Sequence, residues 1–279
     1  MANWFLGIVL GVVQGVSEWL PVSSKTQVII ASSYLFGLSF TQGYALGLFL
    51  EAGTFVAAVV YFRKEVYQIL KALVGRGTSD GKMMLKYLVV VTAVTAVLGV
   101  AIYQVVSEAV VGTVLGVPMI ALGLVLIVDG IIITYSKGRY SPTKGLADLK
   151  LRDMVLIGLA QGISAFPGVS RSGATVSAML LLGIRPSESF RLSFIALIPA
   201  SVGAAGVTIL FSKAALGATL SQVGTSIIVV AILVTMLVGL LSIRVLLRFA
   251  GSKRITLLVF TLGLLAIFSG VSSIVSGSG

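Results

Sequence analysis

Long apolar runs separated by short polar stretches make up most of the chain. In an α-helix, about 20 apolar residues cross the roughly 30 Å hydrocarbon core of a bilayer. Runs of this length predict six membrane-spanning helices, at about residues 43–62, 87–105, 113–135, 192–212, 225–246 and 255–275. The pattern therefore predicts an all-α polytopic integral membrane protein.

Two further apolar arms, residues 4–13 and 28–38, are each only about half a membrane thickness long. A polar segment with Pro21 lies between them, and proline ends helices. A second polar segment, around Pro167 and Gly168, also interrupts apolar sequence. Irregular backbone is tolerated at membrane depth only where it is buried in protein or lines a polar cavity. We therefore expect a re-entrant helical hairpin at each segment.

The two polar segments are copies of one sequence. The first reads Gly-Val-Val-Gln-Gly-Val-Ser-Glu-Trp-Leu-Pro-Val-Ser-Ser over residues 11–24, and the second reads Gly-Leu-Ala-Gln-Gly-Ile-Ser-Ala-Phe-Pro-Gly-Val-Ser-Arg-Ser over residues 158–172. A displacement of 147 positions superposes their glycines and glutamines. The basic loops, which stay in the cytoplasm, put the start of the first hairpin on the outer side of the membrane and the start of the second on the cytoplasmic side. We therefore expect an inverted-topology repeat of residues 1–140 and 141–279. One membrane domain results, with both hairpin tips near the bilayer centre.

Composition agrees with a membrane location. The chain is 57% hydrophobic and 10% charged, with a mean hydropathy of +1.11, which is outside the range of soluble globular proteins. It has no cysteine and no histidine. Their absence excludes disulfides, thiolate nucleophiles and the commonest ligands of zinc. Any general base must therefore be an Asp, Glu, Lys or Tyr.

The net charge of +11 comes from 20 Lys and Arg against nine Asp and Glu. Most basic residues gather in short polar loops at residues 63–86, 137–152, 185–191 and 244–254. Basic loops of membrane proteins stay in the cytoplasm. The pattern thus predicts a multi-pass plasma membrane protein with both termini on the outer side. Topology explains the positive charge, and no nucleic-acid partner is expected.

Arg171 lies where a helix is predicted to begin. Its neighbours are small or hydroxylated: Gly168, Ser170, Ser172 and Thr175. A guanidinium, hydroxyl groups and the free backbone N–H groups of a helix start all favour an oxyanion, so phosphate or diphosphate is the expected ligand. The alternative is a structural ion pair with Glu18 or Glu51. An arginine in a membrane core is costly, which favours the functional interpretation.

Glu18 lies one helical turn after Gln14, on the same face. A carboxylate repels phosphate unless it is protonated or shares a cation with it. Glu18 is therefore expected to act as a general base or to bind Mg²⁺ or Ca²⁺ together with the amide oxygen of Gln14. Substrate oxygens and water would complete the coordination shell. The alternative is a polar Gln–Glu contact between helices.

The first tip also contains Ser23 and Ser24, followed by Lys25. Either hydroxyl can be a nucleophile activated by the nearby carboxylate, a donor to phosphate, or a helix cap. Lys25 either adds positive charge to the same cavity or extends to the membrane surface. Glu51, near the middle of a predicted span, needs a partner or a cavity. We count Lys25, Glu51 and Gln161 as supporting residues.

Two segments resemble the signatures of the undecaprenyl-diphosphate phosphatase family of the bacitracin-resistance type. The first is Gln14-x-x-x-Glu18 with Leu-Pro-Val-Ser-Ser at residues 20–24, and the second is Pro-Gly-Val-Ser-Arg-Ser-Gly-Ala-Thr at residues 167–175. The similarity spans essentially the whole chain. It implies a membrane fold with six spans and two re-entrant hairpins. It also implies metal-dependent removal of the terminal phosphate from a C55 isoprenoid diphosphate, which regenerates the lipid carrier for cell-wall glycans.

By position, the resemblance gives Glu18 and Gln14 the role of the acidic motif and Ser24 that of nucleophile or phosphate donor. The diphosphate clamp is Arg171 with its two flanking serines. One departure is Gln27, which stands where many relatives have histidine and cannot transfer a histidine's proton. Three explanations stay open: Glu18 is the sole base, the family's histidine only hydrogen-bonds, or this chain is a divergent member with altered activity.

The expected substrate is undecaprenyl diphosphate or another long-chain polyprenyl diphosphate, and the expected cofactor is a divalent cation, Mg²⁺ or Ca²⁺. Its lipid tail would stay among the helices while the diphosphate enters the cavity between the tips. The other expected partners are membrane lipids, and a homodimer is compatible with the sequence. A polyprenyl-phosphate transporter or flippase is the rival function, because inverted repeats with broken helices also describe carriers.

Overall fold

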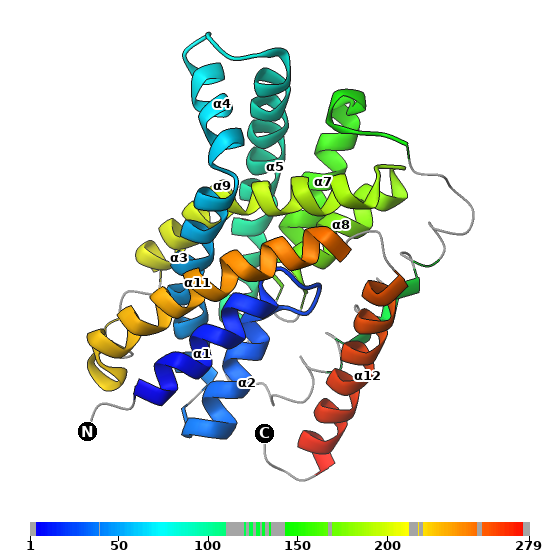
Figure 1. The fold of residues 1–279 in the computed structure, drawn as a ribbon. Helices are drawn as coiled ribbons and strands as arrows, with labels where there is room; N and C mark the ends of the chain where they lie inside the picture. The colour runs from blue at the N-terminus through cyan, green and yellow to red at the C-terminus, as the bar shows by residue number, and fades with distance from the viewer. Residues whose placement is uncertain are drawn as a thin grey trace.

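The computed structural model describes residues 4–38, 40–109, 143–166, 169–211, 217, 220–249 and 253–275, together with eight single positions between 120 and 134. Figure 1 shows a molecule built of helices. No strand occurs within the described ranges, where an isolated bridge joins Lys144 to Ile184. The prediction of an all-α membrane protein is confirmed at this level.

The described helices fall into two parts of the chain. The first part contains α1 (Trp4–Ser17), α2 (Ser24–Phe36), α3 (Phe40–Tyr61), α4 (Arg63–Leu73) and α5 (Ser79–Ala109). The second part contains a 3₁₀ turn (Leu146–Asp148), α7 (Leu151–Ile163), α8 (Arg171–Leu181), α9 (Pro186–Phe211), α11 (Thr225–Phe249) and α12 (Lys253–Val275).

Four helices in the described part of the chain are long and apolar enough to cross a membrane, namely α3, α5, α9 and α11. They coincide with four of the six predicted spans. Helix α12 coincides with the predicted span at 255–275, whereas most of the span at 113–135 lies outside the described residues. The multi-pass fold is therefore confirmed, and the count of six stays a prediction.

Two of these helices begin earlier than the apolar pattern suggested. Helix α5 begins at Ser79 rather than near 87, and α9 begins at Pro186 rather than near 192. The added turns are polar, so a hydropathy pattern cannot detect them. Local signals explain both starts, because Thr78 Oγ1 accepts a hydrogen bond from Gly81 N at 3.1 Å and proline is favoured in the first turn of a helix.

Helices α1 and α2 pack against each other as one hairpin, and α7 and α8 form a second. The four helices contain 14, 13, 13 and 11 residues, so each is about 21 Å long or less. The first break begins at Glu18, directly after α1, and ends at Ser23, whose φ of 49° is left-handed. The second begins after Ile163, and its residues Pro167 and Gly168 lie outside the described part of the chain. The helix–break–helix pattern expected at both segments is present.

The second hairpin repeats the first at the same displacement as the sequence. Helices α1 and α7 begin 147 positions apart, and so do α2 and α8. The packing crosses between the two parts of the chain: α1 packs against α11, and α7 packs against α5. Each hairpin is thus held by a long helix from the other part, which brings the two tips together.

Glycines allow this close packing. An added Cβ on Gly11 of α1 would lie 2.7 Å from the carbonyl oxygen of Ala231 in α11, and one on Gly158 of α7 would lie 2.8 Å from Cβ of Val94 in α5. Both distances are shorter than van der Waals contact. Gly11 and Gly158 are equivalent positions of the duplication, so both halves use the same residue to seat a hairpin.

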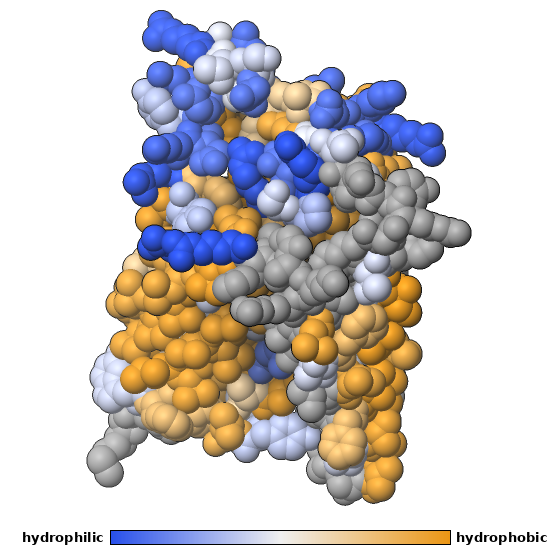
Figure 2. Space-filling model, turned by 45° about the vertical axis from the view of Figure 1, so that its right-hand side comes forward, coloured by the Kyte–Doolittle hydropathy of each residue, from blue (hydrophilic) through white to orange (hydrophobic). Residues whose placement is uncertain are grey.

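Hydrophilic and hydrophobic residues separate along the molecule. Figure 2 shows the hydrophilic residues gathered at the α4 end and a hydrophobic flank beyond them. A hollow at this end is lined by Lys64, Asp80, Asp148, Arg185 and Arg191. It brings together three of the basic loops predicted to share one side of the membrane.

Candidate active site

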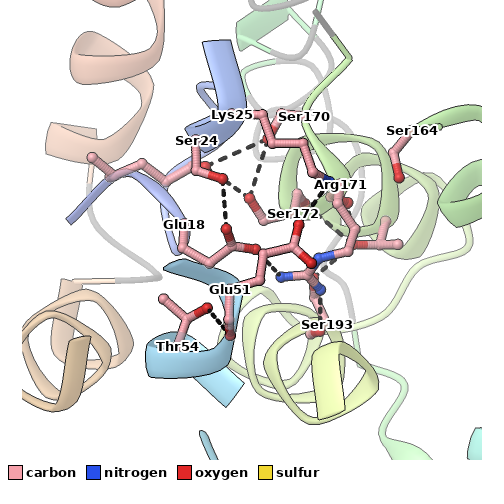
Figure 3. Close-up of polar contacts among 12 residues, drawn as sticks. Glu18, Ser24, Lys25, Glu51, Thr54, Ser164, Ser170, Arg171, Ser172 and Ser193 are labelled. Atoms are coloured by element: carbon pink, nitrogen blue, oxygen red, sulfur yellow. Dashed lines mark hydrogen bonds and ion pairs between the residues drawn. The ribbon is translucent and has the colours of Figure 1, made fainter. Parts of the chain in front are cut away.

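Glu18 occupies the first tip, directly after α1, and is 7% exposed. Its Oε2 accepts hydrogen bonds from Gln14 Nε2 at 2.8 Å and from Ser24 Oγ at 2.5 Å. Its Oε1 accepts one from Arg171 Nη2 at 3.2 Å. Figure 3 shows Glu18, Ser24 and Arg171 pointing toward one another. The structure thus brings together the four central residues of the predicted site.

Arg171 is the first residue of α8. Its Nη1 donates to the backbone carbonyl of Ser193 in α9 at 3.0 Å, while its Nη2 pairs with Glu18. The guanidinium is therefore oriented by two groups from different helices. An arginine fixed in this way presents planar donors in a defined direction, as recognition of a phosphate requires.

Ser170 and Ser172 connect the second tip to the first. Ser172 Oγ donates to the carbonyl of Leu20 at 2.7 Å, and the two serine hydroxyls lie 3.2 Å apart. Ser170 is also the N-cap of α8, because its Oγ accepts from Gly173 N at 3.2 Å. Both serines line the cavity described below. They combine a structural role with access to a ligand.

The start of α2 lies in the same place. Ser23 precedes this helix, but its side chain makes no capping hydrogen bond and its Oγ lies 3.0 Å from Thr26 Oγ1 instead. Ser23, Ser24 and Thr26 all line the cavity. Helices α2 and α8 therefore both begin at the cavity, and the N-terminus of a helix attracts anions.

Lys25 forms an ion pair with Glu51 of α3, with Nζ and Oε1 2.7 Å apart. Both residues line the cavity. Of the two alternatives left open for Lys25, the structure shows the cavity-facing one rather than extension to the membrane surface. Glu51 has the partner that its position in a membrane span requires.

The cavity has a volume of about 220 Å³. The hairpin tips form its polar wall with Glu18, Ser24 and Arg171. Its remaining wall is largely apolar and comes mainly from α5 and α9, including Ala96, Gly99, Val100, Ala200 and Ala204. An amphiphile with a charged head and a hydrocarbon tail matches this division.

Among the described residues, three predicted ones do not line the cavity: Gln14, Gln27 and Thr175. Thr175 is fully buried and bonds within α8 and to α9, through the carbonyl of Arg171 at 2.8 Å and Ser193 Oγ at 2.6 Å. Gln27 donates to the carbonyl of Val22 at 3.2 Å. Neither is among the cavity-lining residues, so the geometry gives both a supporting position. Gly168 lies outside the described residues.

The two equivalent glutamines share an unusual feature. The Oε1 atoms of Gln14 and Gln161 are both buried and have no hydrogen-bond partner in the described part of the chain. Gln161 lines the cavity and donates through Nε2 to Thr95 Oγ1 at 3.2 Å. A buried amide oxygen without a donor is costly. Such an oxygen is a suitable ligand for a hard cation.

No group of three or more Asp, Glu, His or Cys side chains gathers anywhere in the described ranges. The donors that fit Mg²⁺ or Ca²⁺ are the free Oε1 of Gln14 and the carboxylate of Glu18, whose Oε2 accepts a hydrogen bond from Gln14 Nε2. Two protein oxygens suit Mg²⁺, which usually takes its other ligands from phosphate and water.

Sequence reasoning missed several polar residues of the site. Ser193 orients Arg171, and Thr92, Thr95 and Ser164 line the cavity. Thr92 and Thr95 are three residues apart in an otherwise apolar run, which puts them on one helical face. A hydroxyl pair at helical spacing inside a predicted span is the signal that could have identified them.

Comparison with known proteins identifies the family. The family model described as "Bacitracin resistance protein BacA" matches residues 7–268. The chain is 50% identical over 269 residues to an undecaprenyl-diphosphatase of Saccharolobus solfataricus, which covers 96% of each chain. It is 44% identical to one of Sulfurisphaera tokodaii, over 96% of this chain and 97% of that one, and 41% identical to one of Pyrobaculum aerophilum, again over 96% and 97%. This chain therefore belongs to the family of the bacitracin resistance protein BacA.

Proposed function

We propose that this chain is a membrane phosphatase. It hydrolyses undecaprenyl diphosphate, or a similar long-chain polyprenyl diphosphate, to the monophosphate and inorganic phosphate, and so recycles the lipid carrier for cell-wall glycan synthesis. Relatives that share up to half of its residues over nearly the whole chain are named undecaprenyl-diphosphatase. The observation that carries the proposal is the hydrogen bond of Ser24 Oγ to Glu18, in the cavity that Arg171 also lines.

The diphosphate binds at the polar wall. Arg171 offers paired guanidinium donors, Ser170 and Ser172 offer hydroxyl groups, and the starts of α2 and α8 add positive electrostatic potential. The tail extends along the apolar wall between α5 and α9. Only the head and the first part of a long isoprenoid chain fit a cavity of about 220 Å³, so the rest of the tail lies in the surrounding lipid.

The charges that line the cavity support the proposal that the diphosphate binds together with a divalent cation. Among the described residues that line the cavity, the charged ones are two acids, Glu18 and Glu51, and two bases, Lys25 and Arg171, which balance one another. A diphosphate adds about two to three negative charges at neutral pH. A divalent cation restores the balance. Gln14 Oε1 and Glu18 would hold it, and when bound it would supply positive charge to the phosphate oxygens.

Ser24 is the nucleophile in the reaction that the geometry supports. Glu18 takes the proton of the Ser24 hydroxyl, and the serine oxygen attacks the terminal phosphorus. The bond from that phosphorus to the bridging oxygen breaks, and the polyprenyl monophosphate leaves with the electron pair. Arg171 stabilises the charge that develops on the phosphate oxygens. Glu18 passes the serine proton to the leaving monophosphate and is again a carboxylate. Water then attacks the phosphoserine with Glu18 as the base, the bond from phosphorus to the serine oxygen breaks, and Ser24 takes back a proton from Glu18 as inorganic phosphate leaves.

A direct attack by water is the second route, because a water molecule next to Glu18 can use the same base. In that case the Ser24 hydroxyl donates a hydrogen bond to the phosphate. Both routes give the same products. They differ in whether a phosphoserine forms, which is the basis of a test given below.

The membrane arrangement is part of the proposal. The chain forms one domain of two inverted repeats, residues 1–140 and 141–279, with six spans and two re-entrant hairpins in the plasma membrane. Helices shorter than a bilayer, the equal displacement of both hairpins and the clustering of basic loops at one end support this arrangement. The basic end is cytoplasmic and both termini are outside. A homodimer stays a prediction that the mass of the protein in detergent would test.

Purified protein in detergent provides the decisive experiment. We expect release of inorganic phosphate from undecaprenyl diphosphate, dependent on Mg²⁺ or Ca²⁺. The flippase alternative has no support from the named relatives, which carry the name of a hydrolase. Movement of labelled lipid across a vesicle membrane without any phosphate release would contradict the phosphatase and favour the carrier.

A further inference from the structure

A second pair of charges shares the cavity with the proposed reaction. Glu18 and Arg171 carry the chemistry, whereas Lys25 and Glu51 interact with each other, with Nζ and Oε1 2.7 Å apart. All four residues line one cavity, and Figure 3 shows them around the same space. The proposed reaction gives the second pair no role.

Lys25 is well situated to contact the phosphoryl group. It follows Ser24 directly, in the first turn of α2, and 33% of its side chain is exposed. The ammonium group is at the end of a flexible stem and has three donors. It can therefore exchange one acceptor for another while its backbone stays in place. A cation beside the nucleophile lies near the phosphorus that the nucleophile attacks.

Glu51 limits this exchange. It projects from α3 between Leu50 and Ala52, and only 11% of its side chain is exposed. An ionised carboxylate with so little solvent is strongly disfavoured without a partner. Any anion that draws Lys25 away must therefore overcome the loss of the Glu51 pair. A phosphate in the cavity would therefore compete with Glu51 for the same ammonium group.

We propose that Lys25 is a second phosphate-binding cation and that Glu51 holds it when no anion is bound, which sets the affinity of the cavity for phosphate. This proposal rests on the function proposed above. Lys25 contacts the oxygens of the terminal phosphoryl group, and Arg171 contacts the diphosphate from the other tip. After cleavage, Glu51 takes Lys25 back, which favours release of inorganic phosphate.

The test measures equilibrium binding of methylenediphosphonate, a diphosphate analogue that is not hydrolysed, by calorimetry at a fixed Mg²⁺ concentration. The proteins are the unchanged chain, Glu51→Gln, Lys25→Met, Lys25→Arg and the double variant Lys25→Met with Glu51→Gln. We expect Glu51→Gln to tighten binding about tenfold, because it frees Lys25, and Lys25→Met to weaken binding about tenfold. Lys25→Arg keeps most of the affinity, since it keeps the charge.

The double variant separates this proposal from simple charge repulsion. It removes both charges, so no buried carboxylate is left unpaired and the variant stays folded even where Lys25→Met does not. In the Lys25→Met background, Glu51→Gln should leave the affinity unchanged. An equal tightening in both backgrounds would overturn the proposal, because the effect would then be independent of Lys25. So would a Glu51→Gln variant that binds the analogue no more tightly than the unchanged chain.

Phosphate release by the unchanged protein is measured in parallel. A protein that cleaves no polyprenyl diphosphate contradicts the proposed phosphatase, whatever the variants bind. A protein that cleaves its substrate but shows the wrong binding pattern contradicts only the role of Lys25.

Discussion

Glu18 and Arg171 form an ion pair at 3.2 Å although 153 residues separate them in the sequence. One comes from the first hairpin tip and the other from the second. The pair is held on both sides, by Gln14 and Ser24 around the carboxylate and by Ser193 beside the guanidinium. We expect a bound diphosphate to replace Glu18 at the guanidinium, which frees one carboxylate oxygen for a proton or a cation.

Replacing Glu18 by Gln removes the proposed base and keeps its size. We expect kcat for phosphate release to fall by about 10²–10⁴-fold, the usual contribution of a general base. The measurement is phosphate release from undecaprenyl diphosphate in detergent. Glu188→Gln is the matched control, because Glu188 pairs with Arg191 at the α4 end, away from the cavity. Loss of activity in the control but not in Glu18→Gln would contradict the assignment of the base.

Arg171→Lys tests whether paired donors are needed or charge alone is enough. A lysine keeps the positive charge but cannot contact Ser193 and a phosphate with two coplanar groups. We expect kcat/KM to fall by about 10²-fold and Arg171→Ala to be worse still. Kinetics at several salt concentrations provide the measurement. Full activity of Arg171→Lys would mean that the guanidinium geometry has no part in the reaction.

Ser24 is the residue that separates the two routes. If it is the nucleophile, rapid acid quench during turnover traps a phosphoserine at this position, which mass spectrometry detects as a phosphorylated peptide. Ser24→Ala then loses at least about 10²-fold in kcat. Ser17→Ala is the control, because the Ser17 hydroxyl bonds to the carbonyl of Val13 rather than to Glu18. A Ser24→Ala variant with nearly full activity would leave direct attack by water as the reaction.

Gln14 tests the cation site. Its buried Oε1 has no donor among the described residues, so removing it should weaken cation binding without removing the base. We expect Gln14→Ala to need about tenfold more Mg²⁺ for half-maximal activity, with a smaller change in the rate at saturation. Gln14→Glu should need less Mg²⁺ than Gln14→Ala. Identical Mg²⁺ titrations for the unchanged chain and both variants would exclude Gln14 as a ligand.

Gly11 tests how the first tip is held. A methyl group there meets the carbonyl of Ala231 at 2.7 Å, so α1 must move away from α11. We expect Gly11→Ala to destabilise the protein by about 1–3 kcal/mol, measured as a lower melting temperature in detergent. Gly206→Ala is the control, because nothing lies within 4 Å of its added methyl group. Equal melting temperatures for the two variants would contradict the close packing of α1 on α11.

Much of the site could be predicted from the sequence because its reactive residues lie in the two copies of one short polar segment. Glu18, Ser24 and Arg171 lie where proline and glycine interrupt apolar sequence, and polar side chains are costly at membrane depth. The displacement of 147 positions between the two copies also separates the start of α1 from that of α7 and the start of α2 from that of α8. These are local signals, and local signals suffice to locate a helix, a break and a charged residue.

The contacts that orient the side chains of the site could not be predicted from the sequence. Ser193 came from a helix with no visible motif, and Thr175 and Gln27 belong to the motifs yet do not line the cavity. Membrane helices are apolar on the faces that meet lipid and on those that meet protein. Their hydrophobic pattern therefore gives little indication of which face turns inward.

The sequence by itself determined the membrane class, the apolar cores of the long helices, the duplicated breaks and the residue types available for chemistry, because each depends on neighbouring residues alone. Only the tertiary structure decided that α1 packs on α11 and α7 on α5, that Arg171 meets Glu18, and that Lys25 pairs with Glu51. These relationships depend on shape. Gly11 and Gly158, at equivalent positions, let α1 approach α11 and α7 approach α5, although these helices are far apart in the sequence. The packing of the helices then decides which side chains meet.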